Sequence, residues 1–351
     1  MSQTILYDAR PLQPGTRQWG PGVVLNQLLM RLSSNFHFTG MAQDFADAKD
    51  LKISTWKELP KLHNLLFEIS PLLASSFDIY WGTNHFLPQL SLGKPTVITV
   101  HDLLLLRYPN DQRQSRYYSW RLVSSLRRAD RVVAISETTA QDLLVDFPWL
   151  KNKLRVALNG YDSTPVTEQD VGIMRERFPE PYVVMLGGHR PRKNLSLGIA
   201  SVAILRDMGV PIRLIISGNI HTSFQPLLNI HADILEQTGM LSRGQLRALL
   251  KNSQAMLFPS IYEGFGLPLL EAMSQGCPIL ALDIPINREI ANQAALLLPD
   301  DPAEWAKQLK NVLHDSILRT ELIESGFANL KRFDWNYTAN VYTQIFHEVM
   351  T

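Results

Sequence analysis

Short apolar runs alternate with longer amphipathic segments along this chain. The alternation is typical of parallel strands joined by helices, because a strand covered on both faces is apolar throughout, whereas a helix needs only one apolar side. Five runs in each half have the length and content of buried strands: 4–9, 77–82, 96–102, 131–136 and 153–158, then 182–188, 213–218, 255–260, 278–283 and 294–299. Helices are expected between them, for example over 194–208, 243–252 and 267–275. The sequence therefore predicts an α/β fold with two parallel sheets.

A stretch rich in Gly, Pro and charged residues, 159–181, separates the two sets of strands. Such a composition is typical of a linker between domains, and a length of 351 residues agrees with two domains. We therefore expect two Rossmann-like domains that face a central cleft, one over 1–165 and one over 166–332. The last segment, 333–351, has a helical period, and its residues alone do not decide which domain it packs on.

Composition narrows the class of protein. The formal net charge of +1 provides no global field for nucleic acid, so we expect no nucleic-acid partner. Cys277 is the only cysteine, which excludes an internal disulfide, and it is expected to be a small apolar filler. The first residues are too polar for a signal peptide, and no run reaches the roughly 18 apolar residues of a spanning helix. We expect a cytoplasmic protein, with peripheral contact with the inner face of the membrane as an open alternative.

Ligands of open α/β sheets bind beyond the carboxyl ends of the strands, so the residues that follow each predicted strand are site candidates. They are rich in polar side chains and glycine: His101 and Asp102, then 187–194, 217–219 and 260–266. A functional site built from these four strand ends is the expectation.

The segment "PSIYEGFGLPLLEAMSQGCPIL", 259–280, places two glutamates around a glycine-rich turn. The strand before it is expected to end at Pro259, and a helix is expected from Leu267, so that Glu263, Glu271 and the first backbone N–H groups of the helix point to the same side. An ionised carboxylate accepts two vicinal hydroxyls at once, which suggests the ribose and hexose diols of a nucleotide sugar. The alternative is that Glu271 only complements the helix dipole and that Glu263 is a solvated loop residue.

The segment "MLGGHRPRKNL", 185–195, places three cations after a strand that ends in glycine. Arg192 and Lys193 are our candidates for binding a diphosphate, with Arg190 as a weaker third, and Gly187 lets a ligand approach the backbone. An exposed basic helix cap is the alternative. No Asp-x-Asp triplet occurs, so we expect no metal or other cofactor, and the leaving-group charge would fall on the cations and helix N-termini.

Two candidates lie in the first half of the chain. His101 leaves a buried run at a strand end, where it could bind a sugar hydroxyl or stabilise charge; a purely structural histidine is the alternative. The segment "QPGTRQWGPGVV", 13–24, reads as a glycine loop before a helix, and Gly20 and Gly22 are weak candidates for contact with phosphate or acceptor.

These motifs resemble those of the retaining glycosyltransferases of the GT-B fold, family 4, whose signature is two glutamates separated by seven residues. The blocks "YDARPLQPG", "HDLLLLRYP", "RVVAISETTAQDLL", "PRKNL", "GMLSRGQLRALLKNSQAMLFPS" and "FDWNYTA" extend the resemblance over nearly the whole chain. Two segments depart from the pattern: "TRQWGPGVV" replaces a glycine-isoleucine-glycine arrangement, and "DIPINREIANQAA" replaces a serine-rich version in which Glu289 keeps its place.

The resemblance implies a role for each matched residue. His101 and Glu263 would contact the donor sugar, Glu271 would hold the ribose diol, and Arg192 and Lys193 would hold the diphosphate; His101, Glu263, Arg192 and Lys193 are the implied catalytic residues. The implied donor-binding set is Gly187, Arg192, Lys193, Gly218, Met240, Glu263, Gly264, Phe265, Gly266, Leu267 and Glu271, with the backbone of Gly239 and Met240 beside the base. It also implies that the helix in 333–351 crosses back to the N-terminal, acceptor domain.

The activity implied is transfer of a hexose, with retention, from a nucleotide sugar to a saccharide or lipid-linked saccharide in polysaccharide biosynthesis. UDP-glucose is the donor we favour, and GDP-mannose is the alternative. A front-face mechanism and a covalent intermediate on Glu263 both remain open. A nucleotide-sugar epimerase and a non-catalytic nucleotide-sugar binder are the alternatives of another class.

The segment 113–131, "RQSRYYSWRLVSSLRRADR", is dense in arginine and aromatic residues. One hypothesis is that it contacts an anionic acceptor or an anionic membrane surface. The alternative is a solvated helix face with its aromatic rings turned inward.

Overall fold

A computed structural model describes the chain apart from residues 1–2, 14–15, 17–19, 44–52, 57–67, 69–70, 72–75, 109–111, 162–164, 189 and 221. The chain divides into two compact units: unit 1 comprises Met1–Gly160 with Asp334–Thr351, and unit 2 comprises Tyr161–Phe333. The chain therefore passes between the units after Gly160 and after Phe333, five residues before and one residue after the junctions expected at 165/166 and 332/333. Each unit is described by itself below.

Unit 1 contains a seven-stranded parallel sheet in the order β3-β2-β1-β4-β5-β6-β7. Its strands are β1 (Thr4–Asp8), β2 (His37–Gln43), β3 (Ile53–Trp56), β4 (Ile79–Gly82), β5 (Thr96–Val100), β6 (Arg131–Ala134) and β7 (Leu154–Val156). Its main helices are α1 (Gly20–Leu32), α3 (Leu104–Arg107), α4 (Gln112–Arg128), α5 (Glu137–Asp146) and α14 (Trp335–Met350). Ile5 and Tyr7 join the core that includes α1 and α14, whereas Leu6 joins the core that includes α4 and α5. Successive side chains of β1 thus alternate between two apolar layers, as a strand covered on both faces requires.

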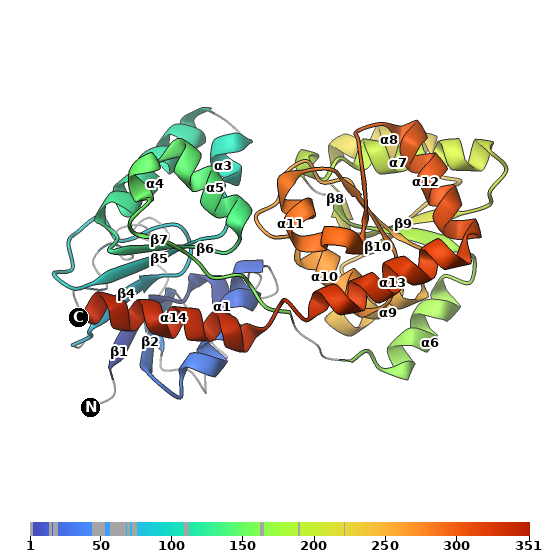
Figure 1. The fold of residues 1–351 in the computed structure, drawn as a ribbon. Coiled ribbons are helices and arrows are strands. Elements are labelled where there is room, and N and C mark those ends of the chain that lie inside the picture. Colours follow the sequence, from blue (N-terminus) through green and yellow to red (C-terminus); the bar gives the residue numbers. More distant parts are fainter. Residues whose placement is uncertain are drawn as a thin grey trace. The chain divides into compact units, whose positions relative to one another are not determined.

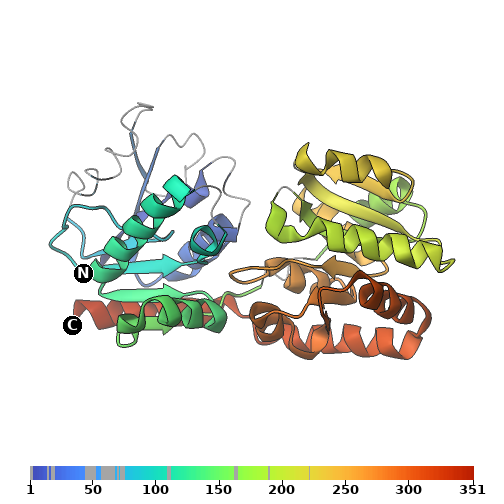
Figure 2. The ribbon, with the colours of Figure 1, turned by 90° about the horizontal axis from the view of Figure 1, so that it is seen from above.

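The last helix, α14, belongs to unit 1, as Figure 1 and Figure 2 both show. It packs on α1, and at most 2% of the surface of Trp335, Tyr342 and Phe346 is exposed. The hydroxyl of Tyr342 shares a hydrogen bond of 2.8 Å with Oγ1 of Thr99 in β5. The crossing back of this helix, implied by the family resemblance, is therefore confirmed.

Unit 2 contains a six-stranded parallel sheet in the order β10-β9-β8-β11-β12-β13. Its strands are β8 (Tyr182–Gly188), β9 (Arg213–Ile220), β10 (Leu235–Gly239), β11 (Met256–Phe258), β12 (Ile279–Leu282) and β13 (Leu296–Leu298). Its helices are α6 (Glu168–Arg177), α7 (Leu195–Asp207), α8 (Gln225–Ile230), α9 (Arg243–Asn252), α10 (Leu267–Ser274), α11 (Pro285–Ala291), α12 (Pro302–His314) and α13 (Ser316–Leu330). Helices α7 and α12 share one apolar core with the sheet, and α10 packs against α9 and α13.

The ten predicted strands and the two-domain Rossmann-like fold are confirmed. The expected linker at 159–181 was wrong in part, because it contains α6, whose N-terminus is capped by the Thr167 side chain and which packs on α9 within unit 2. Among the described residues, none of the helices combines the length and the hydropathy that crossing a membrane requires.

In each sheet, the direction in which successive strands are added along the sheet reverses once. In unit 1 the chain continues on opposite sides of the neighbouring strands β1 and β4, and in unit 2 it does so at β8 and β11. Ligands of open α/β sheets bind beyond the carboxyl ends of the strands at such a switch point. Two places in the molecule are therefore singled out by topology alone.

Candidate functional site

The loop between β11 and α10 places Glu263 at the switch point of unit 2. Gly266 caps α10 with φ +94°, a left-handed conformation, and a Cβ there would lie 3.2 Å from Leu269 Cδ1. Glycine therefore allows the chain to turn sharply into the helix. Phe265 is buried and packs edge-to-face on Phe333 with ring centroids 5.9 Å apart, which fixes the loop just before α10.

Glu263 forms a cluster with the two cations that follow β8. Its Oε1 lies 2.6 Å from Nζ of Lys193, and its Oε2 lies 2.7 Å from Nη1 of Arg192. The same Nη1 donates to the carbonyl of Tyr262 at 2.9 Å, and the N–H of Ile261 donates to the carbonyl of Arg192 at 2.9 Å. Side chain and backbone thus join two loops that are 70 residues apart in sequence.

This contact differs from the arrangement expected from the sequence. The glutamate was expected to face sugar hydroxyls, with the cations on a separate diphosphate site. In the structure, Glu263 and both cations form one charged group, because β8 and β11 are neighbours in the sheet.

The cluster keeps Glu263 ionised. Burial acts most strongly and would raise the pKa of this carboxyl, but the charges and hydrogen bonds of Lys193 and Arg192 together lower the pKa to about 2. At neutral pH the side chain therefore accepts hydrogen bonds and cannot act as a proton donor. Both of its oxygens face a cation.

Backbone geometry positions Lys193. Asn194 adopts φ +48°, so the chain reverses between the short 3-10 turn Pro191–Lys193 and α7. The Nζ of Lys193 lies 5.4 Å from the ring centroid of Phe258, within the range of a cation–π contact. The aromatic ring, the carboxylate and the turn together hold this ammonium at the end of β8.

Glycines occupy the ends of β8, β9 and β10, and the first of them lies beside Lys193. Gly187, Gly218 and Gly239 all have positive φ, at +76°, +101° and +70°. A Cβ on Gly218 would lie 3.8 Å from Cα of Gly187, and a Cβ on Gly187 would lie 3.6 Å from Cε of Lys193. Met240 follows with 65% of its surface exposed. These strand ends therefore present backbone rather than side chains.

The remaining candidates of unit 2 lie close by in sequence. Glu271 is the fifth residue of α10 and is half-buried, Leu267 begins that helix, and Arg190 directly precedes the 3-10 turn that contains Arg192. No group of three His, Cys, Asp or Glu side chains suited to a metal ion occurs among the residues that the structure describes.

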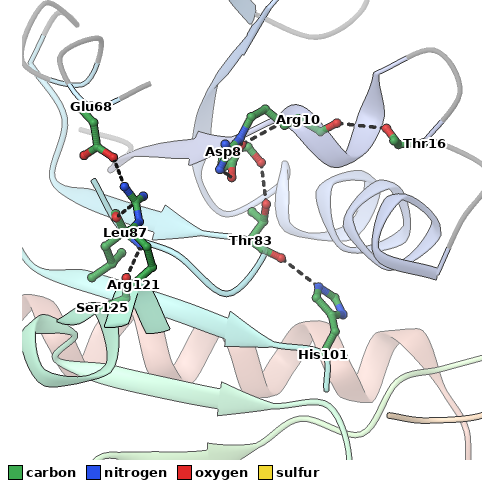
Figure 3. A network of polar contacts seen from close by, with 9 residues as sticks. All are labelled: Asp8, Arg10, Thr16, Glu68, Thr83, Leu87, His101, Arg121 and Ser125. Atoms are coloured by element: carbon green, nitrogen blue, oxygen red, sulfur yellow. Dashed lines mark hydrogen bonds and ion pairs between the residues drawn. The ribbon is translucent and has the colours of Figure 1, made fainter. Parts of the chain in front are cut away.

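Unit 1 carries a second polar network at its own switch point (Figure 3). Asp8, at the end of β1, is fully buried and accepts from Nε of Arg10 at 2.9 Å and from Nη2 at 2.7 Å. Thr83, which follows β4, donates to the carbonyl of Asp8 at 2.6 Å, and its own carbonyl lies 2.9 Å from Nε2 of His101. The three strand ends β1, β4 and β5 are therefore linked by hydrogen bonds.

His101 is 5% exposed, and its tautomer follows from its partner. A carbonyl oxygen only accepts, so Nε2 carries the hydrogen and Nδ1 presents a lone pair. In the described part of the chain, no hydrogen-bond partner reaches Nδ1. Burial first, and His85 second, lower the pKa of His101 to about 4, so the ring is neutral at physiological pH. His101 is thus a buried hydrogen-bond acceptor.

Two other candidates of unit 1 differ from their predicted setting. Gly20 and Gly22 lie in the first turn of α1 and not in a loop before it, because the helix begins at Gly20. Residues 17–19, which belong to the expected loop, lie outside the described residues.

Sequence reasoning did not include the Asp8–Arg10 pair or His85 among the candidates. Asp8 ends β1, and Arg10 and His85 follow β1 and β4, so the strand-end rule would have found them had it been applied to these two strands. His85 is one of three described non-glycine residues with positive φ, at 62°.

Two Rossmann-like units and a strand-end cluster of carboxylate and cations are the features of a GT-B glycosyltransferase. Residues 170–328 match the family of glycosyl transferases group 1, and residues 50–164 match glycosyltransferase family 4. The two matches together extend over more than half of the chain, and the chain belongs to family 4 of the glycosyltransferases. It is therefore an enzyme of the hexosyltransferase class.

Several relatives transfer mannose according to their names. The chain is 28% identical over 265 residues to an O-antigen chain mannosyltransferase, RfbU, of Salmonella typhimurium. The matched region covers 73% of this chain and 72% of that protein. It is 25% identical to O-antigen chain mannosyltransferase B of Escherichia coli, over 75% and 74% of the two chains. The crystal structure of Anabaena Alr3699/HepE in complex with UDP-glucose superposes with a TM-score of 0.79 at 16% identity, over 98% of this chain and 99% of that one. At 16% identity, this structural similarity shows the fold alone.

Proposed function

We propose that this protein is a retaining hexosyltransferase that moves a mannosyl group from a nucleotide sugar to a saccharide or lipid-linked saccharide acceptor of a surface polysaccharide. The observation that carries the proposal is the cluster of Glu263, Arg192 and Lys193 at the switch point of unit 2. Two fixed cations suit the charge of a departing diphosphate, and an ionised carboxylate beside them suits sugar hydroxyls.

The names of the relatives favour mannose over glucose as the transferred sugar. The sequence alone favoured UDP-glucose, with GDP-mannose as the alternative, and the relatives reverse that order of preference. The base stays a prediction, because the backbone around Gly239 and Met240 is expected to contact it and backbone groups do not identify a base. GDP-mannose is therefore the first donor to test and UDP-glucose the second.

In the proposed reaction, the bond between the anomeric carbon and the diphosphate oxygen breaks while the acceptor oxygen forms its bond on the same face. The departing diphosphate takes the proton of the acceptor hydroxyl. Arg192 and Lys193 stabilise the negative charge that develops on the diphosphate. Glu263 serves as a hydrogen-bond acceptor for the sugar; a role as covalent nucleophile is less favourable, because both oxygens face cations and the pKa is about 2.

Two further residues contact the ligand in this proposal. Glu271 holds the ribose diol, and the Nδ1 of His101 accepts a hydrogen bond from a hydroxyl of the ligand.

Because side chains neutralise the charge of the leaving group, we propose that transfer needs no metal ion or other cofactor. Excess EDTA is then expected to leave the rate unchanged, and a rate that returns only with Mg²⁺ or Mn²⁺ contradicts this part.

The nucleotide specificity is tested by thermal shift with GDP, UDP, dTDP and ADP in the presence of EDTA. A ligand at 100 times its dissociation constant stabilises the folded protein by about 2.7 kcal/mol. We expect one clear preference, which Glu271→Ala abolishes. No shift with any of the four nucleotides argues against the proposed donor site. Retention is then checked by NMR, from the anomeric configuration of the product formed first.

The exposed face of α4 supports a membrane-associated acceptor. Arg113, Arg116, Tyr117, Trp120 and Arg127 are exposed at helical spacing, and the helix contains no acidic residue. Tyr118, Leu122 and Leu126, on the opposite face, are buried in the core. Contrary to an inward-facing arrangement, Tyr117 and Trp120 are 54% and 58% exposed, with ring centroids 6.2 Å apart.

We propose that this face of α4 rests on an anionic lipid surface at the cytoplasmic side of the membrane, where lipid-linked acceptors lie. Co-sedimentation with vesicles that contain anionic lipid tests this. Arg113→Ser with Arg116→Ser is expected to weaken binding, whereas Lys307→Ser with Lys310→Ser, which removes two exposed cations from α12, is expected to leave it unchanged. Equal effects of the two pairs would attribute any binding to net charge alone.

A further inference from the structure

His85 occupies an unusual backbone conformation directly after β4. Its φ of 62° is left-handed, a region that only about a few per cent of residues with a Cβ adopt, most often Asn, Asp and His. The N–H of His85 donates to the carbonyl of Thr99 in β5 at 3.0 Å, which fixes the residue against the neighbouring strand. A residue held in this way by a packed sheet has a fixed side-chain direction.

The side chain of His85 contacts the end of β5. Its Nε2 accepts from the backbone N–H of His101 at 3.2 Å and from that of Asp102 at 3.3 Å. These two amides lie beyond the last ladder residue, Val100, and each is satisfied by the ring of His85. The imidazole therefore takes the place of a further strand at this point of the sheet.

Only one protonation state of His85 supports this contact. Both partners of Nε2 are N–H donors, so Nε2 must carry a lone pair, and the ring hydrogen is on Nδ1. Protonation of Nε2 would place three N–H groups against one another. The groups that face the ring are Asp102, His101 with ring centroids 5.8 Å apart, Phe86, and Tyr118 of α4 at 6.0 Å.

The consequence falls on His101. Its backbone N–H is held by His85, and its ring Nε2–H is held by the carbonyl of Thr83, so both ends of the residue are fixed and Nδ1 remains as an acceptor. The two anchors come from the same short segment after β4. A change in that segment therefore changes the direction of the lone pair on Nδ1.

We propose that His85 is a positioning residue: as a neutral Nδ1–H imidazole, it holds the end of β5 so that His101 presents Nδ1 to a hydroxyl of the ligand. The role of His85 in sugar transfer rests on the proposed function, whereas the tautomers expected for His85 and His101 rest only on the hydrogen bonds described above. Because the ring nitrogens can be observed without any sugar nucleotide, a failure of the positioning proposal is distinguishable from a failure of the proposed function.

Two variants separate this role from a merely structural one. In His85→Gln, the amide oxygen reaches towards the same two N–H groups and accepts from them; in His85→Leu, the two amides lose their acceptor. Glutamine and leucine at position 85 must both adopt the same left-handed backbone conformation, so any backbone strain is the same in the two variants. Circular dichroism and the melting temperature identify the folded variants to be compared.

The first measurement is two-dimensional NMR of the ¹⁵N-labelled histidine rings at neutral pH. In the wild type, we expect the hydrogen of His85 on Nδ1 and that of His101 on Nε2. The His101 pattern is expected to persist in His85→Gln and to become a mixture of tautomers in His85→Leu. A hydrogen on Nε2 of His85, or an unchanged His101 in His85→Leu, overturns the proposal.

The second measurement is transfer activity with the preferred donor. Misplacing a contact at the reacting sugar costs about 10- to 100-fold in kcat/KM, which is the loss expected for His85→Leu, whereas His85→Gln is expected to recover most of it. The acid limb of the wild-type pH–rate profile is expected to shift to lower pH in His85→Gln, since glutamine does not titrate. Equal activities of folded His85→Gln and His85→Leu, whether high or low, overturn the role. If no donor supports transfer, the NMR result alone decides on the positioning.

Discussion

Replacing Glu263 by glutamine tests the charged cluster at the ends of β8 and β11. The substitution keeps the shape of the side chain and removes its charge, so Arg192 and Lys193 lose their anionic partner. A decrease of the pKa of Glu263 from 4.5 to about 2 corresponds to about 3 kcal/mol of folding free energy at neutral pH. We expect Glu263→Gln to lower the free energy of unfolding by about 3 kcal/mol. This value lies at the lower end of the loss of about 3–5 kcal/mol that follows when one partner of a buried ion pair is removed.

The pH dependence gives the prediction a sign. Because the pKa of Glu263 is lower in the folded than in the unfolded state, its contribution is complete above pH 4.5 and is lost as the pH falls towards about 2. On acidification the wild type loses the stability that the ionised Glu263 carboxylate contributes. Glu263→Gln lacks this carboxylate, so its stability does not change for this reason. Urea denaturation of both proteins at neutral pH and at a pH below 4.5, followed by tryptophan fluorescence, measures the difference.

The matched control is Asp283→Asn. Asp283 accepts from Nε of Arg288 at 2.6 Å and from Nη2 at 2.8 Å, so its geometry is as favourable as that of Glu263. Its side chain and that of Arg288 are 37% and 59% exposed, however, and solvent screens an exposed pair. We expect a much smaller loss of stability for Asp283→Asn. Equal losses for Asp283→Asn and Glu263→Gln would refute the inference that burial gives the cluster its strength.

One further outcome is expected for Glu263→Gln, and two further substitutions test the packing of unit 1. Glu263→Gln is expected to bind inorganic diphosphate more tightly in calorimetry, because Arg192 and Lys193 are no longer shared with a carboxylate; weaker binding contradicts the assignment of these cations to the diphosphate. Gly160→Ala is expected to destabilise unit 1 by about 3 kcal/mol in thermal unfolding, because its Cβ would lie 2.3 Å from the backbone N of Trp335. Tyr342→Phe, which removes the hydrogen bond of 2.8 Å to Thr99, is expected to cost about 1 kcal/mol in the same assay.

The sequence predicted the strands that read as apolar runs, including the edge strands β7 and β13, and missed three others. Strands such as β5 and β12 are buried throughout because both faces are covered, and most of their residues are apolar. The three strands that were not predicted, β2, β3 and β10, have mixed sequences, and β3 and β10 form the edges of their sheets. An edge strand such as Leu235–Gly239 is only partly buried, so its residues do not show the apolar run that marks a central strand.

The sequence predicted the residues of the candidate site and their place at strand ends, but not the ion pairs between them. Strand ends are visible in the local pattern, and this is why His101, Lys193 and Glu263 were found. That Lys193 contacts Glu263 depends on β8 and β11 being neighbours, and strand order is a property of the whole sheet that no local pattern contains. The positioning of His101 by His85 depends in the same way on β4 lying beside β5.

The position of α14 has a consequence for the order in which the chain becomes folded during synthesis. All residues of unit 2 lie between Tyr161 and Phe333, so they leave the ribosome as one continuous block that contains its complete apolar core. Unit 1 begins earlier but remains open until Asp334–Thr351 have emerged to cover α1 and the sheet. The second unit can therefore mature before the first. A chain cut after Phe333 would contain the whole of unit 2, attached to an N-terminal sheet with one uncovered apolar face, a product suited to rapid degradation.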